Sequence, residues 1–259
     1  MIESAIVRPP SATFGKGITT AGLGPPDLPL ALEQHEGYVQ ALERAGVKVI
    51  RLEPDPEHPD STFVEDTAVL VGANSAILAR PGAPTRRGEV PSVRRALENL
   101  VPRIHAIEPP GTLDGGDVLE TFDRFIIGIS QRTNEDGARQ LAGFLHDEGV
   151  VSSNLDIRGI PGLLHLKTGI SFLGNGRVFA VESLERAARG MGYTVVLVPG
   201  DEAYAANCVV VNERLLLPAG YPRSEAILGD LGHTVVSLEM SEFRKMDGGL
   251  SCLSLRIMF

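Results

Sequence analysis

The apolar positions along the chain recur in one short, repeated order. A polar motif precedes an apolar segment, a turn, a second apolar segment, a helical stretch and a third apolar run. In the first clear copy, "FVEDTAVLVGANSAILARPG" predicts strands at Val69–Val71 and Ala76–Leu78, joined at "GANS". "VPSVRRALENL" follows, with Val93, Leu97 and Leu100 at helical spacing. The order predicts a strand–strand–helix–strand unit.

Three further copies and one incomplete copy follow, each beginning roughly forty to fifty residues after the last. "LDGGDVLETFDRFIIGIS" turns at Asp123-Arg124, and its helix ends at Gly149, a suitable C-cap. "LHLKTGISFLGNGRVFAV" turns at Gly174–Gly176 and leads to a short helix at about Leu184–Arg189. "ANCVVVNERLLLPAG" is the fourth copy, and "DGGLSCLSLRIMF" supplies one strand of a fifth.

The N-terminal segment can complete the fifth unit. "SAIVRPP" predicts a strand, "VKVIRL" another, and "LALEQHEGYVQALERAG" a helix with inward residues Leu32, Tyr38, Val39 and Leu42. Pairing the two ends would close a ring and leave no open edge. We therefore predict the α/β class, as a five-bladed propeller, with residues 1–259 as one catalytic domain. An ordinary α+β domain whose hairpins are alike by chance is the alternative.

A ring would bring the polar motifs together, because equivalent positions of similar units converge on the axis. These positions carry carboxylates, a histidine and thiols: Glu65-Asp66, Asp114 to Asp117, His165, Asn207-Cys208 and Cys252. Residues distant in the sequence would then form one site with a nucleophile, a base and an anionic pocket.

Composition narrows the classes of partner. The net charge of −9 disfavours nucleic acid, because phosphate binding needs clustered lysine and arginine. No signal peptide and no apolar run of membrane-spanning length is present. Two cysteines without a CxxC or HExxH motif fit a reduced, cytoplasmic protein that needs no metal.

Each candidate residue also has an ordinary structural interpretation. Cys252 lies in an alternating apolar stretch, where a free cysteine usually packs as a small hydrophobe. A lone histidine such as His165 is often a core residue, and Asp114 and Asp117 in "LDGGD" are typical of a turn. Their shared place at the start of each copy is what favours a functional role.

Three further groups are candidates for binding a ligand. Asp60, Glu65 and Asp66 crowd three carboxylates before a buried strand, where buried acids need a cationic partner. None lies close in sequence, so a cationic ligand is a candidate. Arg86 and Arg132 follow the first two hairpins and could bind a carboxylate. "TFGKGITTAGLG" is either a surface linker or a mobile lid.

The ordered motifs "PDSTFVEDTAV", "ARPGAPTRRGE", "GTLDGGDVL", "QRTNEDGARQL", "LHLKTG", "ANCVVVNERLLLPAGYP" and "DGGLSCLSLR" resemble those of dimethylarginine dimethylaminohydrolases, within the guanidine-modifying superfamily. The resemblance covers essentially the whole chain. It implies a five-bladed α/β propeller that hydrolyses methylated arginines to citrulline without a cofactor, and it is compatible with a homodimer. An arginine deiminase-type hydrolase is the alternative, although the helical insertion of those enzymes is absent.

The resemblance also implies roles for individual residues. Cys252 would be the nucleophile, His165 the general acid and base, and Asp114 its orienting carboxylate, where some relatives have glutamate. Cys208 matches a position that is not the nucleophile. The implied substrate contacts are Asp66 and Glu65 for the guanidinium, Asp60 and the Ile18 backbone for the α-amine, and Arg86 and Arg132 for the α-carboxylate.

Overall fold

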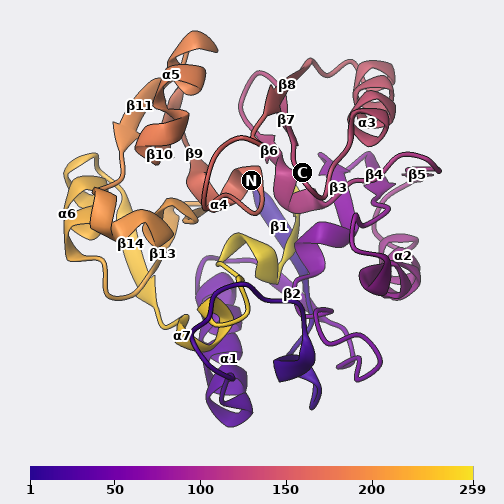
Figure 1. Ribbon diagram of the computed structural model, residues 1–259, viewed down its shortest axis with the longest axis horizontal. Helices are drawn as coiled ribbons and strands as arrows, with labels where there is room; N and C mark the ends of the chain where they lie inside the picture. Colours follow the sequence, from indigo (N-terminus) through magenta and orange to yellow (C-terminus); the bar gives the residue numbers. More distant parts are fainter. Residues whose placement is uncertain (259) are drawn as a thin grey trace.

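Five three-stranded sheets surround a central axis in the computed structural model, which describes residues 1–258 (Figure 1). Four sheets are consecutive in sequence. Their strands are β3 (Ala68–Val71), β4 (Ser75–Leu78), β5 (Arg103–Ala106); β6 (Val118–Glu120), β7 (Phe125–Ile129), β8 (Ser152–Asp156); β9 (Ile170–Gly174), β10 (Arg177–Ala180), β11 (Thr194–Leu197); and β12 (Val209–Val211), β13 (Arg214–Pro218), β14 (Thr234–Leu238). In each, the first two strands are antiparallel and the third is parallel to the second.

The fifth sheet joins the two ends of the described chain. Strand β1 (Ile2–Val7) lies between β2 (Lys48–Arg51), to which it is parallel, and β15 (Leu255–Met258), to which it is antiparallel. Ala5 pairs with Arg256 and Ile6 with Leu255. The predicted closure of the ring by its two ends is therefore confirmed, and with it the five-bladed arrangement.

Helices cover the outer side of the sheets (Figure 1). The longer ones are α1 (Leu28–Arg44), α2 (Val90–Leu97), α3 (Glu135–Asp147), α5 (Glu182–Gly190) and α6 (Pro222–Asp230). Local signals fix their ends. The Asn134 side chain accepts a hydrogen bond from the Gly137 amide at the start of α3, and Gly149 beyond its end has a φ of 75°. None of the helices within residues 1–258 is long and apolar enough to cross a lipid bilayer.

Helix α1 corrects one sequence prediction. Tyr38, Val39 and Leu42 are fully buried as expected, but Leu32 is 41% exposed. In the first turn of the helix, the buried stripe passes through Ala31 instead, and His35 continues it one turn later. Alanine and histidine carry a weak hydrophobic signal, so the pattern of large apolar residues misplaced the stripe by one position.

Each polar motif lies in, or directly beside, short helical turns that lead into the inner strand of its sheet. These turns are η2 (Val64–Thr67), η4 (Gly115–Asp117), α4 (Leu166–Gly169), η5 (Gly200–Ala206) and η6 (Ser251–Leu253). Contacts between η6 and η2, η2 and η4, η4 and α4, and α4 and η5 bring these turns together around the axis. The short turns were not predicted, but the convergence of the motifs was. The remaining short helices are η1 (Phe14–Lys16), η3 (Pro84–Glu89) and α7 (Ser241–Arg244).

Candidate active site

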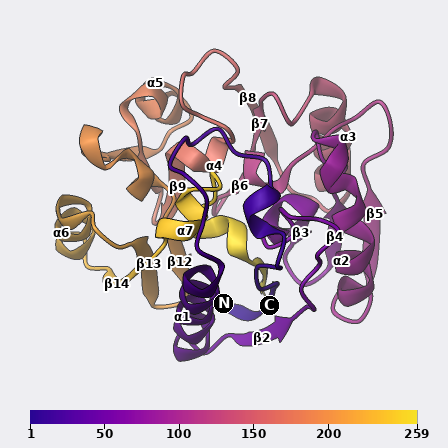
Figure 2. The same cartoon turned by 60° about the horizontal axis from the view of Figure 1, so that its bottom comes forward.

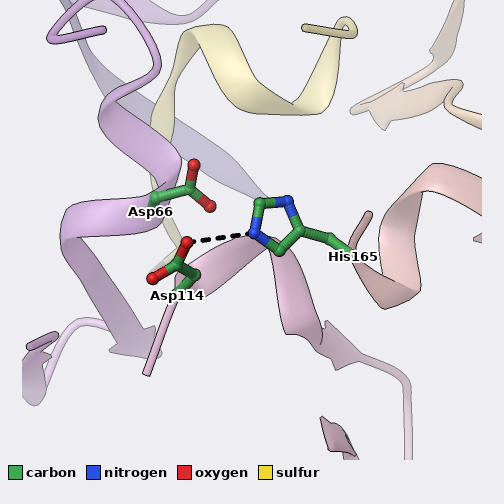
Figure 3. A group of neighbouring side chains, drawn as sticks. All are labelled: Asp66, Asp114 and His165. Carbon is green, nitrogen blue, oxygen red and sulfur yellow. Dashed lines mark hydrogen bonds and ion pairs between the residues drawn. The ribbon is translucent and has the colours of Figure 1, made fainter. Parts of the chain in front are cut away.

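His165 and Asp114 form a buried pair at the centre of the ring. The imidazole Nε2 of His165 lies 3.0 Å from Oδ2 of Asp114, as Figure 3 shows. His165 precedes α4 and Asp114 precedes η4, so two blades supply the pair. The second oxygen of Asp114 accepts a hydrogen bond from the Gly82 amide at 2.9 Å. Asp114 has no exposed surface, so it contacts the histidine and not the solvent.

Electrostatics favour the protonated imidazole. Burial alone would lower the pKa of His165, but the carboxylates of Asp66, Asp117 and Asp114 outweigh it and raise this pKa to about 9. Burial acts in the opposite direction on Asp114 and would raise its pKa. The hydrogen bond and the electrostatic attraction to His165 outweigh this and lower the pKa of Asp114. The pair is therefore an imidazolium beside a carboxylate at neutral pH.

Asp66, Asp114 and His165 are also close enough together to hold a metal ion, since their ligand atoms lie within 4.8 Å of one another (Figure 3). The carboxylate oxygens already have partners. Asp66 accepts from Arg86 at 2.5 Å and from the Gly116 amide at 2.9 Å. Both oxygens of Asp114 are also engaged, so the carboxylates of this group have hydrogen-bond partners within the protein.

The two glycines of "LDGGD" allow this close packing. A Cβ on Gly116 would lie 2.9 Å from the ring of His165 and 2.8 Å from a carboxylate oxygen of Asp66. A Cβ on Gly115 would overlap the carbonyl oxygen of Glu65. Glycine is therefore needed at Gly116 because the backbone passes directly beneath the imidazole, and at Gly115 because it packs against the backbone of η2.

Cys252 approaches the same place from the end of the chain. It lies in η6 and is half-buried. Asn207 fixes this turn: its Oδ1 accepts from the Ser251 amide at 2.9 Å, and its Nδ2 donates to the Ser251 hydroxyl at 2.9 Å. Burial raises the pKa of the Cys252 thiol to about 12, and the charges of Glu65 and Asp66 add to the rise. In the ligand-free protein the thiol is neutral.

Two adjoining cavities open around Cys252 and His165. The larger, of about 480 Å³, is also lined by Glu65, Lys167 and Tyr204. The smaller contains the other predicted binding residues. They are Ile18, Asp60, Asp66, Arg86 and Arg132. All predicted site residues except Asp114, which lies behind His165, therefore line one continuous region.

The segment between β1 and α1 arches over this region (Figure 2). The Ile18 amide donates to both carboxylate oxygens of Asp60, at 3.0 and 3.2 Å. A Cβ on Gly17 would overlap Asp60, so glycine permits the approach. Thr20 donates its amide and hydroxyl to Oδ2 of Asp247, at 2.6 and 3.0 Å. The segment thus covers the site and is held by two carboxylates.

The two predicted carboxylate-binding arginines differ in their surroundings. Arg86 is 5% exposed and pairs with Asp66 and with Glu89, the latter at 2.8 Å. It also donates to the backbone carbonyls of Asp60 and Phe63. The side chain of Arg132 is half-buried and has no hydrogen-bond partner among residues 1–258. Arg132 is therefore the freer guanidinium.

The acidic cluster has partners within the protein. Glu65 accepts from Lys167 at 2.7 Å and from Arg256 at 3.1 Å through Oε1, and from Ser251 through Oε2. Asp66 is paired with Arg86. These cations lie 20 or more residues away in the sequence, so the buried acids have partners within the protein and do not need a cationic ligand to compensate them.

Two residues support the site in ways that the sequence did not predict. Asp117 accepts hydrogen bonds from Ser130, Thr133 and the Leu166 amide, so it fixes the backbone next to His165. Asp247, which holds Thr20, has a φ of 58° in the left-handed region. This conformation appears only in the structure and is not encoded in any sequence motif that could have revealed the contact with Thr20.

Comparison with known proteins finds the same family that the sequence motifs resemble. The family profile "N,N dimethylarginine dimethylhydrolase, eukaryotic" matches residues 28–175. The N(G),N(G)-dimethylarginine dimethylaminohydrolase of Pseudomonas aeruginosa is 40% identical, over 99% of this chain and 100% of that protein. That of Streptomyces coelicolor is 35% identical, over 98% and 97% of the two chains.

Solved structures have the same fold as this chain. A cysteine-to-serine mutant of the Pseudomonas aeruginosa enzyme, complexed with citrulline, matches with a TM-score of 0.95 at 39% identity, over 99% of this chain and 100% of that chain. The N-terminal domain of the cyanobacterial arginine dihydrolase ArgZ shares the fold, with a TM-score of 0.89 at 20% identity over 100% and 98% of the chains.

The fold and these likenesses define a hydrolase of the five-bladed α/β propeller class, acting on carbon–nitrogen bonds. Within that class, the profile match and the near full-length identity are decisive. The chain belongs to the dimethylarginine dimethylaminohydrolase family.

Proposed function

We propose that this protein hydrolyses asymmetric dimethylarginine and monomethylarginine to citrulline and dimethylamine or methylamine. The observation that carries the proposal is the thiol of Cys252 on one cavity with His165, which the buried Asp114 orients. A thiol and a base together serve covalent catalysis and would be superfluous in a protein that only binds arginine. The family membership supports the same reaction.

The substrate would extend between the two cavities. Its α-carboxylate would bind Arg132, with Arg86 behind, and its α-ammonium would bind Asp60 and the backbone near Ile18. Its guanidinium would face Asp66 and Glu65, beside Cys252. All of these residues line the cavities, and their charges are complementary to the three charged groups of the substrate.

The reaction would begin by ionising the thiol. Burial and the carboxylates of Glu65 and Asp66 hold the pKa of Cys252 high, and a bound guanidinium opposes these carboxylates, so the thiol loses its proton to solvent when substrate is present. The thiolate attacks the guanidinium carbon, and protonated His165 gives its proton to the departing amine, so the C–N bond breaks and an S-alkylthiouronium remains. Neutral His165 then takes a proton from water, which attacks the same carbon. The C–S bond breaks, the proton of the new hydroxyl group passes to the departing sulfur, and citrulline and the Cys252 thiol are released.

Parallel assays of citrulline release from arginine, monomethylarginine and asymmetric dimethylarginine test this proposal. We expect turnover of the two methylated arginines and little of arginine. Preference for arginine, with release of ammonia, would instead identify an arginine deiminase-type hydrolase. No citrulline from any of the three would contradict both.

The family resemblance also supports a cytoplasmic protein whose partner is the small substrate, without nucleic acid or membrane, and it is compatible with a homodimer. Sedimentation of the purified protein would determine its oligomeric state.

Replacing Arg132 with alanine is expected to raise KM for methylarginines by about 10- to 100-fold, the loss of a charge-assisted hydrogen bond to carboxylate. The effect on kcat should be smaller, because Arg132 is remote from the reacting carbon. Steady-state kinetics measures both values. Arg139→Ala, at an exposed ion pair on α3, is the matched control and should change neither. An unchanged KM in Arg132→Ala would contradict the assigned contact.

The high pKa of Cys252 predicts selective alkylation. Iodoacetamide should react slowly at neutral pH because the thiol is protonated. 2-Chloroacetamidine carries an amidinium that mimics the substrate charge, so it should inactivate the enzyme faster despite its poorer leaving group. Mass spectrometry should find the adduct on Cys252 and none on Cys208, which is buried. Equal rates with both reagents would argue against this activation.

A further inference from the structure

A third cavity, of about 500 Å³, lies along the axis on the other side of the candidate active site. The inner strand of every sheet contributes to its wall, namely β3, β6, β9, β12 and β15. Glu65, Lys167 and Ser251 line both this cavity and the larger active-site cavity. The hydrogen bonds of these three residues therefore separate the larger active-site cavity from the third cavity, which we call the axial pocket.

The walls of the axial pocket are largely apolar. Aromatic and aliphatic side chains come from several blades, including Leu119, Phe122, Phe172, Val210 and Met258. Phe122, in the turn between β6 and β7, is 93% exposed. A large exposed aromatic beside an apolar cavity is typical of a site for a ligand with apolar groups.

Among the charged groups of the axial pocket, Glu120 differs from the others. Lys167 and Arg256 donate to Glu65, and Arg256 also donates to the carbonyl and hydroxyl oxygens of Ser254. The half-buried Glu120 carboxylate has no hydrogen-bond or ion-pair partner among residues 1–258. It is therefore an acceptor without a donor, in an apolar setting.

The titration of Glu120 agrees with this geometry. Burial raises the pKa of Glu120 to about 7, although the positive charges of Arg256 and Lys167 act in the opposite direction. These two cations thus fail to compensate the cost of burying the carboxylate, because their donors are directed at other oxygens.

We propose that the axial pocket binds a small organic ammonium ion with an apolar substituent, whose N–H groups donate to Glu120. The carboxylate supplies charge and hydrogen-bond acceptors, and the phenylalanine side chains supply apolar surface and aromatic faces that attract alkylated cations. The unpaired Glu120 carboxylate would repel an anion. A neutral ligand would leave the negative charge of Glu120 without a counter-charge. The site is separate from the one that would hold the methylarginine.

Methionine-methyl NMR can test the proposal, because a different methionine reports on each site. Met258 lines the axial pocket and Met246 lines the smaller active-site cavity. Benzylammonium is the probe and benzyl alcohol its uncharged counterpart, both titrated at pH 8.5, where Glu120 is ionised. Glu213→Gln changes an exposed glutamate in the turn between β12 and β13 and serves as the matched control for Glu120→Gln.

We expect saturable shifts of the Met258 methyl signal with benzylammonium in the wild type and in Glu213→Gln. In Glu120→Gln the affinity should be at least about tenfold lower, the loss of one hydrogen bond to a charged group. At pH 5.5, where Glu120 is protonated, the wild-type protein should bind benzylammonium about as weakly as Glu120→Gln does. This measurement tests the role of Glu120 without a substitution. Three outcomes would overturn the proposal: an unchanged Met258 signal, shifts at Met246 alone, or equal binding of benzyl alcohol.

Discussion

Replacing Cys252 with serine is expected to lower citrulline release by about 10⁴-fold or more, the scale on which removal of an enzyme nucleophile acts. A serine hydroxyl has a much higher pKa than a thiol, and no base in the site is placed to ionise it, since His165 is protonated at neutral pH. Single-turnover assays with asymmetric dimethylarginine measure the loss, and trapping with acid should find no covalent adduct.

Cys208→Ser is the control for that experiment. Cys208 is buried, and burial raises the pKa of its thiol to about 12. Its replacement should cost some stability, because a hydroxyl enters an apolar cluster, but kcat of the folded protein should stay within a few-fold of the wild type. Circular dichroism should show that both variants are folded. Turnover by Cys252→Ser close to that of the wild type would refute the nucleophile assignment.

Replacing His165 with glutamine is expected to lower kcat by about 10²- to 10⁴-fold, the usual contribution of a general acid and base. Glutamine keeps a polar group beside Asp114 but cannot protonate a departing amine. The loss should be smaller for a substrate with a more acidic leaving group, such as S-methylthiocitrulline, because methanethiolate can depart without being protonated. His146→Gln, at an exposed histidine of α3, is the matched control and should be fully active.

The pH profile supplies a second readout for His165. The pKa of His165 in the ligand-free protein is raised to about 9, so the imidazolium persists through neutral pH and is lost as the pH rises through 9. The kcat/KM for dimethylarginine should therefore fall above pH 9 in the wild type. This fall should disappear from the residual activity of His165→Gln. An alkaline limb that survives the substitution would assign it to another group.

The architecture could be predicted from the sequence because it depends on repetition. The alternation of apolar and polar positions in each copy specified the strand pairs, and the positions of the polar motifs specified which residues meet at the axis. The pairing of β1 with β15 followed because the last copy supplies one strand and the N-terminal segment supplies the other two. Each of these inferences used only the spacing of apolar segments and polar motifs, which can be read directly from the sequence.

Pairing across the ring could not be predicted in the same way. Arg86 was expected to face a ligand, yet most of its donors are taken by Asp66, Glu89 and two backbone carbonyls. Lys167 lies two residues after His165, and only the helical turn of α4 directs it toward Glu65. Such contacts depend on side-chain direction between distant blades, which a one-dimensional pattern does not contain.

The pairing of Ile2 with Met258 in neighbouring strands has a consequence for the order of the chain. With the ends this close, a short linker could join them, and new termini could be cut at the exposed turn between β6 and β7, where Phe122 protrudes. Such a circular permutant would keep all five sheets and every side chain of the site. The order in which the blades are connected would then be incidental to the active structure.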